Sequence, residues 1–216
     1  MPDSAVIGYV HPGTVRAEFC ASLLAVCMEG QTPVTQVLAV GSGPNISHAR
    51  NVVCRQFLEQ DAADWLFMCD TDMWFGRDMI DRLAAAADPV ERPVVGALCF
   101  SQNTDDGGGE PYPTMYELTE RPDGDLAFIR YKRWPEDAVV RVSGTGAAAL
   151  LIHRRALEAV EKRAADDAAP WFRESQTKTA LMGEDLTFCL RCAAAGIPVH
   201  VHTGVRAGHM KTTMLI

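Results

Sequence analysis

The sequence lacks any long apolar run: none approaches the roughly 20 residues that a membrane-crossing helix needs. The first apolar segment has no basic flank before it, so the start of the chain does not resemble a signal peptide. Positive charge is not in excess either, because 20 Lys and Arg stand against 28 Asp and Glu, a net charge of −8. This balance argues against a surface coated for nucleic acid, although it leaves room for a local basic patch. We expect a cytoplasmic protein without stable membrane association.

Cysteines are present but form no pattern of a disulfide framework or a zinc finger. The seven are scattered and odd in number, and residues such as Cys69 and Cys99 lie in apolar runs, as reduced core thiols do. Cys189 and Cys192 form one CxxC without a second pair, which favours buried helix residues over a zinc or redox site.

Internal repeats, heptads and linkers are also missing. With 216 residues, 48% of them hydrophobic, the chain is predicted to form a single domain, residues 1–216.

Strand-like and helix-like segments alternate through the first half. Short apolar runs predict strands, and segments with helical spacing lie between them. The predicted strands are residues 5–10, 36–40, 65–69 and 94–100, and the predicted helices are residues 16–28, 45–59 and 77–87. Such alternation with short connections indicates an α/β fold with parallel strands, in which ligands gather at the carboxyl ends of the strands.

The pattern changes in the second half. Residues 101–113 (SQNTDDGGGEPYP) form a polar segment long enough to be a lid or an insertion. Further strands are predicted at residues 115–118, 127–133, 139–142 and 199–203, and further helices at residues 154–167 and 184–195.

The segment WLFMCDTDMWF ends an apolar run on two aspartates, Asp70 and Asp72. If the backbone stays extended, the two carboxylates converge while Thr71 faces away. Paired carboxylates at a strand end suit Mg²⁺ or Mn²⁺, usually completed by a phosphate. A capping or turn pair of aspartates explains the motif equally well.

Five features in a fixed order resemble the nucleotide-sugar-dependent glycosyltransferases of the GT-A fold. They are the first strand and its loop, ISHARN, CDTDMWF, VSGTGAAALLIHRRAL, and GEDLTFCLRCAAAGIPV with a later histidine. Together they span nearly the whole chain, as in compact phage and bacterial members. The resemblance implies a Rossmann-like three-layer sandwich with a mixed, mainly parallel sheet. It also implies a donor half at about residues 1–100 and an acceptor half at about residues 101–216.

The resemblance implies a nucleoside-diphosphate sugar as donor and a divalent metal as cofactor. Asp72 would bind the metal, and Asp70 would reach the ribose or the metal. His209 matches a late histidine ligand, and because imidazole suits Mn²⁺ better than Mg²⁺, manganese is the expected ion. A surface histidine near a mobile terminus is the alternative. His200 and His202, on one face of a strand, are a rival metal pair.

Other residues are expected at the donor. An aromatic on a first strand is often core, a helix arginine is often solvated, and glycine is common at strand-to-turn junctions, so each has an ordinary explanation. The expected donor contacts are Tyr9, Val10, His11, Arg50, Asp70, Thr71, Gly144 and Lys211.

The acid pair Glu184 and Asp185 opens a predicted helix. Such a pair often only stabilises the helix dipole. In inverting members of the family a similar aspartate deprotonates the acceptor hydroxyl, so Asp185 is the expected base and Glu184 the residue that holds a sugar. A retaining enzyme would need no such base.

The acceptor is the least defined part. Residues 128–134 interleave cations with aromatics, as where a polyanion or a base is gripped, through Arg130, Lys132, Arg133 and Trp134. A solvated edge strand explains them as well. A 5-hydroxymethylpyrimidine in phage DNA, which would place the protein in the host cytoplasm, and a saccharide or small molecule therefore both stay open.

Three other classes share parts of this pattern. Haloacid-dehalogenase phosphatases carry an early DxD that Thr or Val usually follows, whereas Met73 follows here. A sugar-nucleotide nucleotidyltransferase would normally have a glycine-rich basic loop after the first strand. A non-catalytic sugar-nucleotide-binding module is the remaining alternative.

Overall fold

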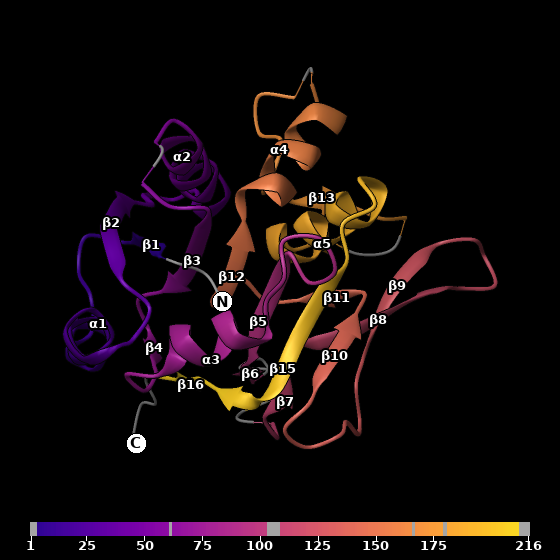
Figure 1. Ribbon diagram of the computed structural model, residues 1–216. Coiled ribbons are helices and arrows are strands. Elements are labelled where there is room, and N and C mark those ends of the chain that lie inside the picture. Colours follow the sequence, from indigo (N-terminus) through magenta and orange to yellow (C-terminus); the bar gives the residue numbers. More distant parts are fainter. Residues whose placement is uncertain (1–3, 61, 103–108, 166, 179–180, 212–216) are drawn as a thin grey trace.

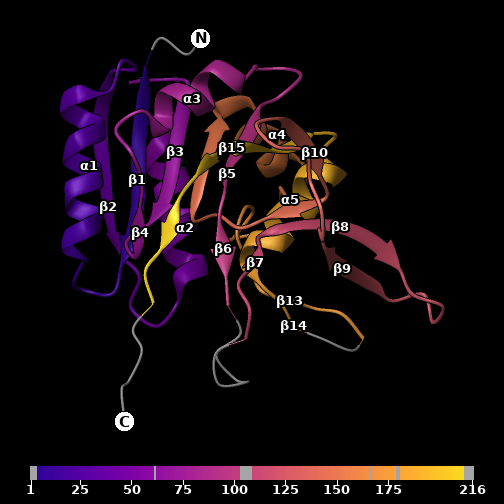
Figure 2. The ribbon, with the colours of Figure 1, turned by 90° about the horizontal axis from the view of Figure 1, so that it is seen from below.

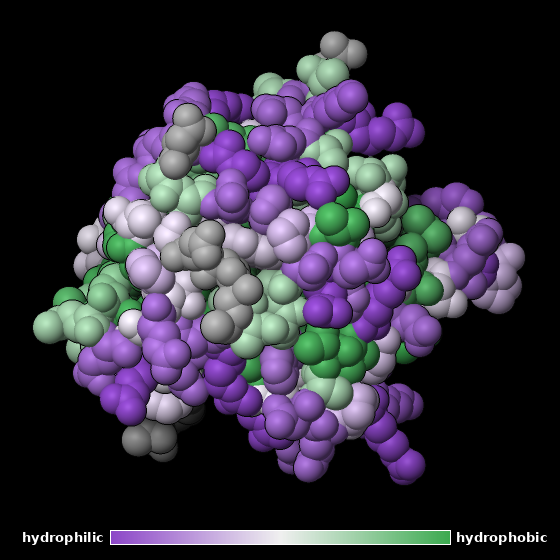
Figure 3. Space-filling view, viewed as in Figure 1, coloured by the Kyte–Doolittle hydropathy of each residue, from purple (hydrophilic) through white to green (hydrophobic). Residues whose placement is uncertain are grey.

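The computed structural model describes residues 4–60, 62–102, 109–165, 167–178 and 181–211. Its helices are α1 (Ala17–Glu29), α2 (Ile46–Leu58), α3 (Met79–Ala86), α4 (Arg154–Arg163) and α5 (Glu184–Ala194). Among the described residues, no helix is both long and apolar enough to cross a membrane. Hydrophilic side chains spread over most of the face in Figure 3, with smaller apolar areas between them.

A seven-stranded sheet forms the centre, in the order β10-β15-β5-β12-β3-β1-β2. Its strands are β1 (Ala5–His11), β2 (Val34–Gly41), β3 (Trp65–Asp70), β5 (Val94–Leu98), β10 (Val139–Val142), β12 (Ala149–His153) and β15 (Val199–Arg206). β1, β2, β3, β5 and β15 run in one direction, whereas β12 and β10 run against them. The expected mixed, mainly parallel sheet is confirmed.

Helices cover both faces of the sheet, as the three-layer prediction requires. α2, α4 and α5 lie on one face, and α1 and α3 lie on the other (Figure 1). The alternation of β3 shows the cause: Leu66 and Met68 join the core under α2, α4 and α5, while Trp65 and Phe67 join the core over α1 and α3. A strand buried on both faces reads as a continuous apolar run, as β3 does.

Most predicted elements are present within a few residues of their expected ends. The start of α2 follows from Asn45, whose side chain accepts a hydrogen bond from the backbone N–H of His48 at 2.9 Å. The predicted helix at residues 154–167 is too long, since α4 ends at Arg163. The chain leaves the helix because the Asp167 carboxylate accepts from the N–H of Ala169 and pairs with Arg191, which fixes a loop instead.

Shorter strands surround the carboxyl edge of the sheet. β8 (Met115–Glu120) pairs with β9 (Leu126–Arg130) and β11 (Gly144–Thr145), and the β8–β9 hairpin projects from the body in both ribbon views (Figure 2). The two-stranded pairs are β4 (Met73–Trp74) with β16 (Gly208–His209), β6 (Phe100–Ser101) with β7 (Tyr112–Pro113), and β13 (Ser175–Gln176) with β14 (Leu181–Met182). β6 and β7 join the two ends of the predicted lid, whose residues 103–108 lie outside the described residues.

Close packing of α2 on β1 gives a first prediction. A Cβ added at Gly8 would overlap Cγ1 of Val53 and lie 3.0 Å from Cδ1 of Leu66. We expect Gly8→Ala to lower the free energy of unfolding by about 1–3 kcal/mol, measured by urea denaturation. Gly41→Ala is the matched control, because no heavy atom of the described chain would lie within 4 Å of its Cβ. Equal stability of the two variants would contradict this packing.

Candidate functional site

The carboxyl ends of β1, β2 and β3 lie side by side and bring the loops of the first half together. The loop after β2 is tied to the end of β1, since the backbone N–H of Ser42 donates to the carbonyl of His11 at 2.8 Å. Thr71, which follows β3, donates through its hydroxyl to the carbonyl of Val10 at 3.5 Å. This edge is where a parallel α/β sheet presents its ligands.

A buried arginine links three elements at this edge. Arg50 of α2 is 3% exposed, and its Nη2 donates to Oδ1 of Asp70 at 2.6 Å. Its Nη1 donates to Oε1 of Glu184, the first residue of α5, at 2.5 Å. Burial would lower the pKa of Arg50, but the nearby carboxylates outweigh that effect and raise it. The guanidinium therefore stays charged and joins the end of β3 to the start of α5.

A stacked pair of aromatic rings lies against the Arg50 guanidinium. The Arg50 Cζ lies 5.7 Å from the ring centroid of Phe172, which stacks on Phe188 of α5 with centroids 4.6 Å apart. Both rings are completely buried. The charged cluster is thus supported from below by rings that also hold α5 in place.

Asp185 lies beside this cluster with a shifted pKa. Burial is the main cause, the Arg50 charge opposes it, and Glu184 adds to it, so that the pKa of Asp185 rises to about 6. The Oδ1 atom accepts a hydrogen bond from the backbone N–H of Leu186 at 2.7 Å. A carboxylate with such a pKa can take up a proton near neutral pH.

The two glycines around Thr145 differ in their surroundings. Gly144 is buried in β11, where a Cβ would lie 2.7 Å from Phe128 and 2.8 Å from Leu186. Its Cα therefore lies against packed side chains, and the donor contact expected there stays a prediction. Gly146 is the glycine next to Asp185, since a Cβ there would lie 3.6 Å from Oδ2.

Asp72 belongs to a second cluster at the same edge. β4 pairs with β16 in an antiparallel ladder, and this pairing brings His209 beside Asp72, with Nε2 and Oδ2 2.9 Å apart. The Nζ of Lys211 lies 2.7 Å from the same Nε2. Burial would raise the pKa of Asp72, but the hydrogen bond and charge of His209 and the charge of Lys211 lower it. In turn, the hydrogen bond to Asp72 raises the pKa of His209 against the effect of burial.

The two aspartates of the DxD do not act as an extended pair, contrary to the sequence argument. β3 ends at Asp70, and Thr71 and Asp72 form a turn before β4, so the alternation of an extended strand no longer applies. Asp70 pairs with Arg50, whereas Asp72 pairs with His209. Among the described residues, no group of three or more His, Cys, Asp and Glu side chains is arranged to hold a metal.

Two of the three expected metal ligands nevertheless form a suitable donor set. The carbonyl of Phe100 lies 3.0 Å from Nδ1 of His209 and can only accept, so in the neutral ring Nδ1 carries the proton. The lone pair of Nε2 then accepts from the Lys211 ammonium and lies beside the Asp72 carboxylate. An imidazole nitrogen beside a carboxylate is a donor pair that would suit Mn²⁺.

The expected donor residues of β1 divide into core and edge. Val10 is buried, and Tyr9 is half-buried with its ring 5.1 Å from that of Phe19. His11 ends the strand, and its Nδ1 accepts from the N–H of Gly13 at 3.1 Å. Thr71 is buried against β1, so Tyr9 and His11 are the half-buried members of this group.

The four predicted acceptor residues do not form one exposed strip. The Arg130 Cζ lies 3.4 Å from the ring centroid of Tyr112. Trp134 is half-buried with its ring 6.2 Å from that of Phe100, whereas Lys132 and Arg133 are exposed. Arg130, Lys132 and Arg133 are exposed, as the edge-strand alternative expects, and Trp134 is the half-buried member of the four.

The rival metal pair lies elsewhere on the sheet. His200 and His202 of β15 alternate with buried valines, as expected, and pair with Arg141 and Val139 of β10. Burial and nearby arginines lower the pKa of both histidines. The CxxC cysteines are buried in α5, where burial raises the pKa of Cys189 to about 12.

Known proteins resemble this chain in structure and not in sequence. No family model matches the sequence, and no curated protein does. The crystal structure of A197 from STIV gives a TM-score of 0.60 at 16% identity, covering 97% of this chain and 86% of that one. GalNAc-T7 with UDP, GalNAc and Mn²⁺ gives 0.65 at 10% identity, covering 97% of this chain and 44% of that one.

The fold is GT-A-like. At these identities the likeness concerns the fold alone, and this chain spans less than half of the GalNAc-T7 chain. The site in this GT-A-like fold also contains Phe172, a residue that sequence reasoning missed. The aromatic pair at residues 171–172 was the available signal.

The buried arginine gives a second prediction. Arg50→Met keeps the side-chain length but leaves the partly buried carboxylates of Asp70 and Glu184 without their cation, and breaking a buried ion pair typically costs about 3–5 kcal/mol of unfolding free energy. Chemical denaturation followed by circular dichroism measures the loss. Arg77→Met is the control, since the Arg77–Glu29 pair is solvent-exposed and its removal is expected to change stability little. A wild-type denaturation curve for Arg50→Met would refute the role assigned to this charge.

Proposed function

We propose that this protein is a glycosyltransferase that moves a sugar from a nucleoside-diphosphate sugar to a hydroxyl acceptor. The observation that carries the proposal is the charged cluster of Arg50, Asp70 and Glu184 beside Asp185, at the ligand edge of a GT-A-like sheet. A carboxylate near neutral pKa beside a fixed charge network suits proton removal from a hydroxyl.

In this proposal Asp185 is the general base of an inverting reaction. Its Oδ1 is engaged by the N–H of Leu186, so Oδ2, on the side of Gly146, accepts the proton of the acceptor hydroxyl. The missing side chain at Gly146 leaves space beside Oδ2 for the attacking oxygen. Glu184, with one oxygen on Arg50, has its other oxygen for a sugar hydroxyl and holds the reacting groups in line.

The donor diphosphate is assigned to the second cluster. Asp72 and His209 would hold the divalent ion, Mn²⁺ in preference to Mg²⁺, and the bound ion would act as a Lewis acid that stabilises the leaving diphosphate. Lys211 places an exposed ammonium next to His209 and supplies positive charge to the same phosphates. Asp70 is assigned to positioning through Arg50, and a contact to the ribose remains part of the proposal.

The reaction products separate the proposed activity from its alternatives. The protein is incubated with a panel of nucleoside-diphosphate sugars and Mn²⁺, with and without hydroxyl acceptors. Nucleoside diphosphate supports glycosyl transfer, whereas inorganic phosphate alone indicates a phosphatase and pyrophosphate indicates a nucleotidyltransferase. Donor binding without any product indicates a binding module.

Loss of the proposed metal ligands gives a third prediction. We expect Asp72→Asn and His209→Gln each to lower Mn²⁺-dependent release of nucleoside diphosphate at least about 100-fold, because the leaving diphosphate loses its charge stabilisation. Asp78→Asn, an exposed aspartate outside the cluster, is the matched control. Wild-type turnover in Asp72→Asn would remove this assignment.

The pH dependence of transfer gives a fourth prediction. Because the pKa of Asp185 is raised to about 6, its carboxylate is protonated and inactive as a base below that pH and becomes active as the pH rises through it. We expect kcat/KM to fall about tenfold per pH unit below pH 6. The Asp185→Asn variant should lose transfer at least about 100-fold at pH 8.

Metal loading distinguishes this acid limb from loss of the metal. A limb caused by protonation of His209 moves to lower pH as Mn²⁺ is raised, because the metal competes with the proton. A limb caused by Asp185 stays where it is at saturating Mn²⁺. A profile that keeps full activity down to about pH 4 would contradict the base assignment.

A further inference from the structure

A groove opens between the start of α2 and the segment that follows α4. It has a volume of about 510 Å³, within the size range of small-molecule sites. One wall is the turn into α2, with Asn45, Ser47 and His48. The other wall is residues 167–174, which contain no helix or strand. Neither the charge cluster around Arg50 nor the Asp72–His209 cluster belongs to its lining.

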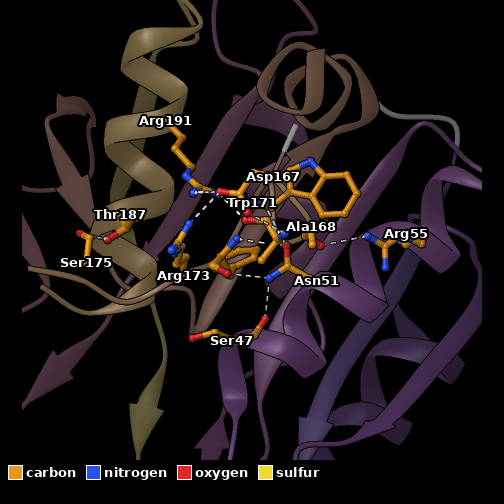
Figure 4. Close-up of polar contacts among 12 residues, drawn as sticks. Ser47, Asn51, Arg55, Asp167, Ala168, Trp171, Arg173, Ser175, Thr187 and Arg191 are labelled. Atoms are coloured by element: carbon orange, nitrogen blue, oxygen red, sulfur yellow. Dashed lines mark hydrogen bonds and ion pairs between the residues drawn. The ribbon is translucent and has the colours of Figure 1, made fainter. Parts of the chain in front are cut away.

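A single buried amide holds the two walls together. Asn51 is 2% exposed, and its Nδ2 donates to the carbonyls of Ser47 at 2.7 Å and Phe172 at 2.6 Å. Its Oδ1 accepts from the backbone N–H groups of Trp171 at 3.1 Å and Phe172 at 3.4 Å (Figure 4). All the hydrogen-bonding capacity of the amide is therefore spent on fixing residues 171–172 against α2.

Two arginines also bind this segment, one from α5 and one from α2. Arg191 of α5 donates to the carbonyl of Ala169 and pairs with Asp167 at 2.7 Å, while Arg55 of α2 donates to the carbonyl of Ala168 at 3.4 Å (Figure 4). Trp171 is completely buried, and its indole N–H donates to the carbonyl of Leu157 at 2.9 Å. A stretch without secondary structure thus has a fixed shape before any ligand arrives, which lowers the entropic cost of binding.

The groups that line the groove are suited to binding a neutral ligand rich in hydroxyl groups. Pro44, Ile46 and Ala168 supply apolar surface, and amide, hydroxyl, imidazole, guanidinium and carboxylate groups stand around it. Its charges nearly balance, because Arg173 is paired with Asp167 at 3.2 Å and Glu174 adds a further carboxylate. A phosphodiester chain would need an excess of cations, which this groove lacks among its described lining.

Phe172 connects the groove to the proposed reaction centre. It lines the groove, lies under the guanidinium of Arg50, and stacks on Phe188 of the helix that begins with Glu184 and Asp185. A ligand in the groove therefore lies next to the layer that holds the proposed base, on the α2 side.

We propose that the groove between residues 44–48 and 167–174 is an acceptor subsite for a saccharide. This inference rests on the proposed glycosyltransferase function, and it selects the saccharide from the acceptor classes that the sequence left open. The apolar side chains of the groove lining face the C–H surfaces of the sugar rings, and the polar groups of both walls form hydrogen bonds with the sugar hydroxyls.

The test fills the groove without touching the charge clusters. Ala168 is exposed on the groove wall, so Ala168→Trp places an indole in the groove with little effect on the core. Ala194→Trp, at an exposed position near the end of α5, is the matched control. Lactose, maltose, cellobiose and chitobiose at millimolar concentrations are titrated into ¹⁵N-labelled protein, and amide shifts are followed.

We expect at least one disaccharide to shift the amide signals of Ser47, His48 and Arg173. Its affinity should fall at least about tenfold in Ala168→Trp and stay unchanged in Ala194→Trp. No shift with any of the four sugars, shifts confined to other regions, or equal affinity in the two tryptophan variants would overturn the proposal. Shifts of these amides by a single-stranded oligonucleotide alone would overturn it in favour of nucleic acid.

Acceptor-independent turnover separates this proposal from the general function. Hydrolysis of the nucleoside-diphosphate sugar in water needs the donor site only, so Ala168→Trp should retain it within about twofold while the KM for the disaccharide rises at least about tenfold. Absence of donor cleavage by the wild-type protein both with and without the hydroxyl acceptors would refute the glycosyltransferase function, and the saccharide titration would still decide whether the groove binds a sugar.

Discussion

The positive charge of Arg50, buried between Asp70 and Glu184, is the constraint on which the rest of the site depends. Removing such a charge from water is costly, and only close carboxylates offset the cost. The pairing therefore fixes the register of three elements at once: the middle of α2, the end of β3 and the start of α5. It also sets the field at Asp185, whose pKa reflects burial opposed by the same guanidinium.

A consequence of this pairing is that the two aspartates of one short motif serve different clusters. Asp70 is committed to the arginine, and the turn that follows carries Asp72 to the C-terminal hairpin, where His209 meets it. In the proposed function, proton transfer and phosphate binding are therefore carried out by separate groups at one edge of the sheet. A GT-A-like sheet provides this edge at 10–16% identity to the structures it resembles, because two layers of alternating apolar residues define the sheet and leave the loops free to differ.

The groove beside α2 follows the same physical pattern as the charged cluster. In both places a buried polar side chain of α2 uses its hydrogen bonds to hold other segments: Arg50 joins the end of β3 to the start of α5, and Asn51 holds residues 171–172, which have no regular structure. The two residues are neighbours on one helix, and Phe172 contacts both. A polar residue on the buried face of a helix is costly unless satisfied, so these two bind their partners firmly and make the surrounding surface rigid.

The sequence by itself determined the elements and their layers, since apolar alternation, helical spacing and the Asn45 cap are local signals. It also placed Arg50, the DxD, Glu184, Asp185 and His209 in their order along the chain. Only the tertiary structure decided how they are paired: Asp70 faces Arg50, Asp72 faces His209, and Gly146 lies beside Asp185 whereas Gly144 is packed against Phe128 and Leu186. These choices depend on contacts between residues far apart in the chain, and hydrophobic periodicity carries no information about which distant charges meet. The groove could not be predicted from the sequence for the same reason. Its wall at residues 167–174 has no hydrophobic periodicity, and hydrogen bonds from other helices fix its shape.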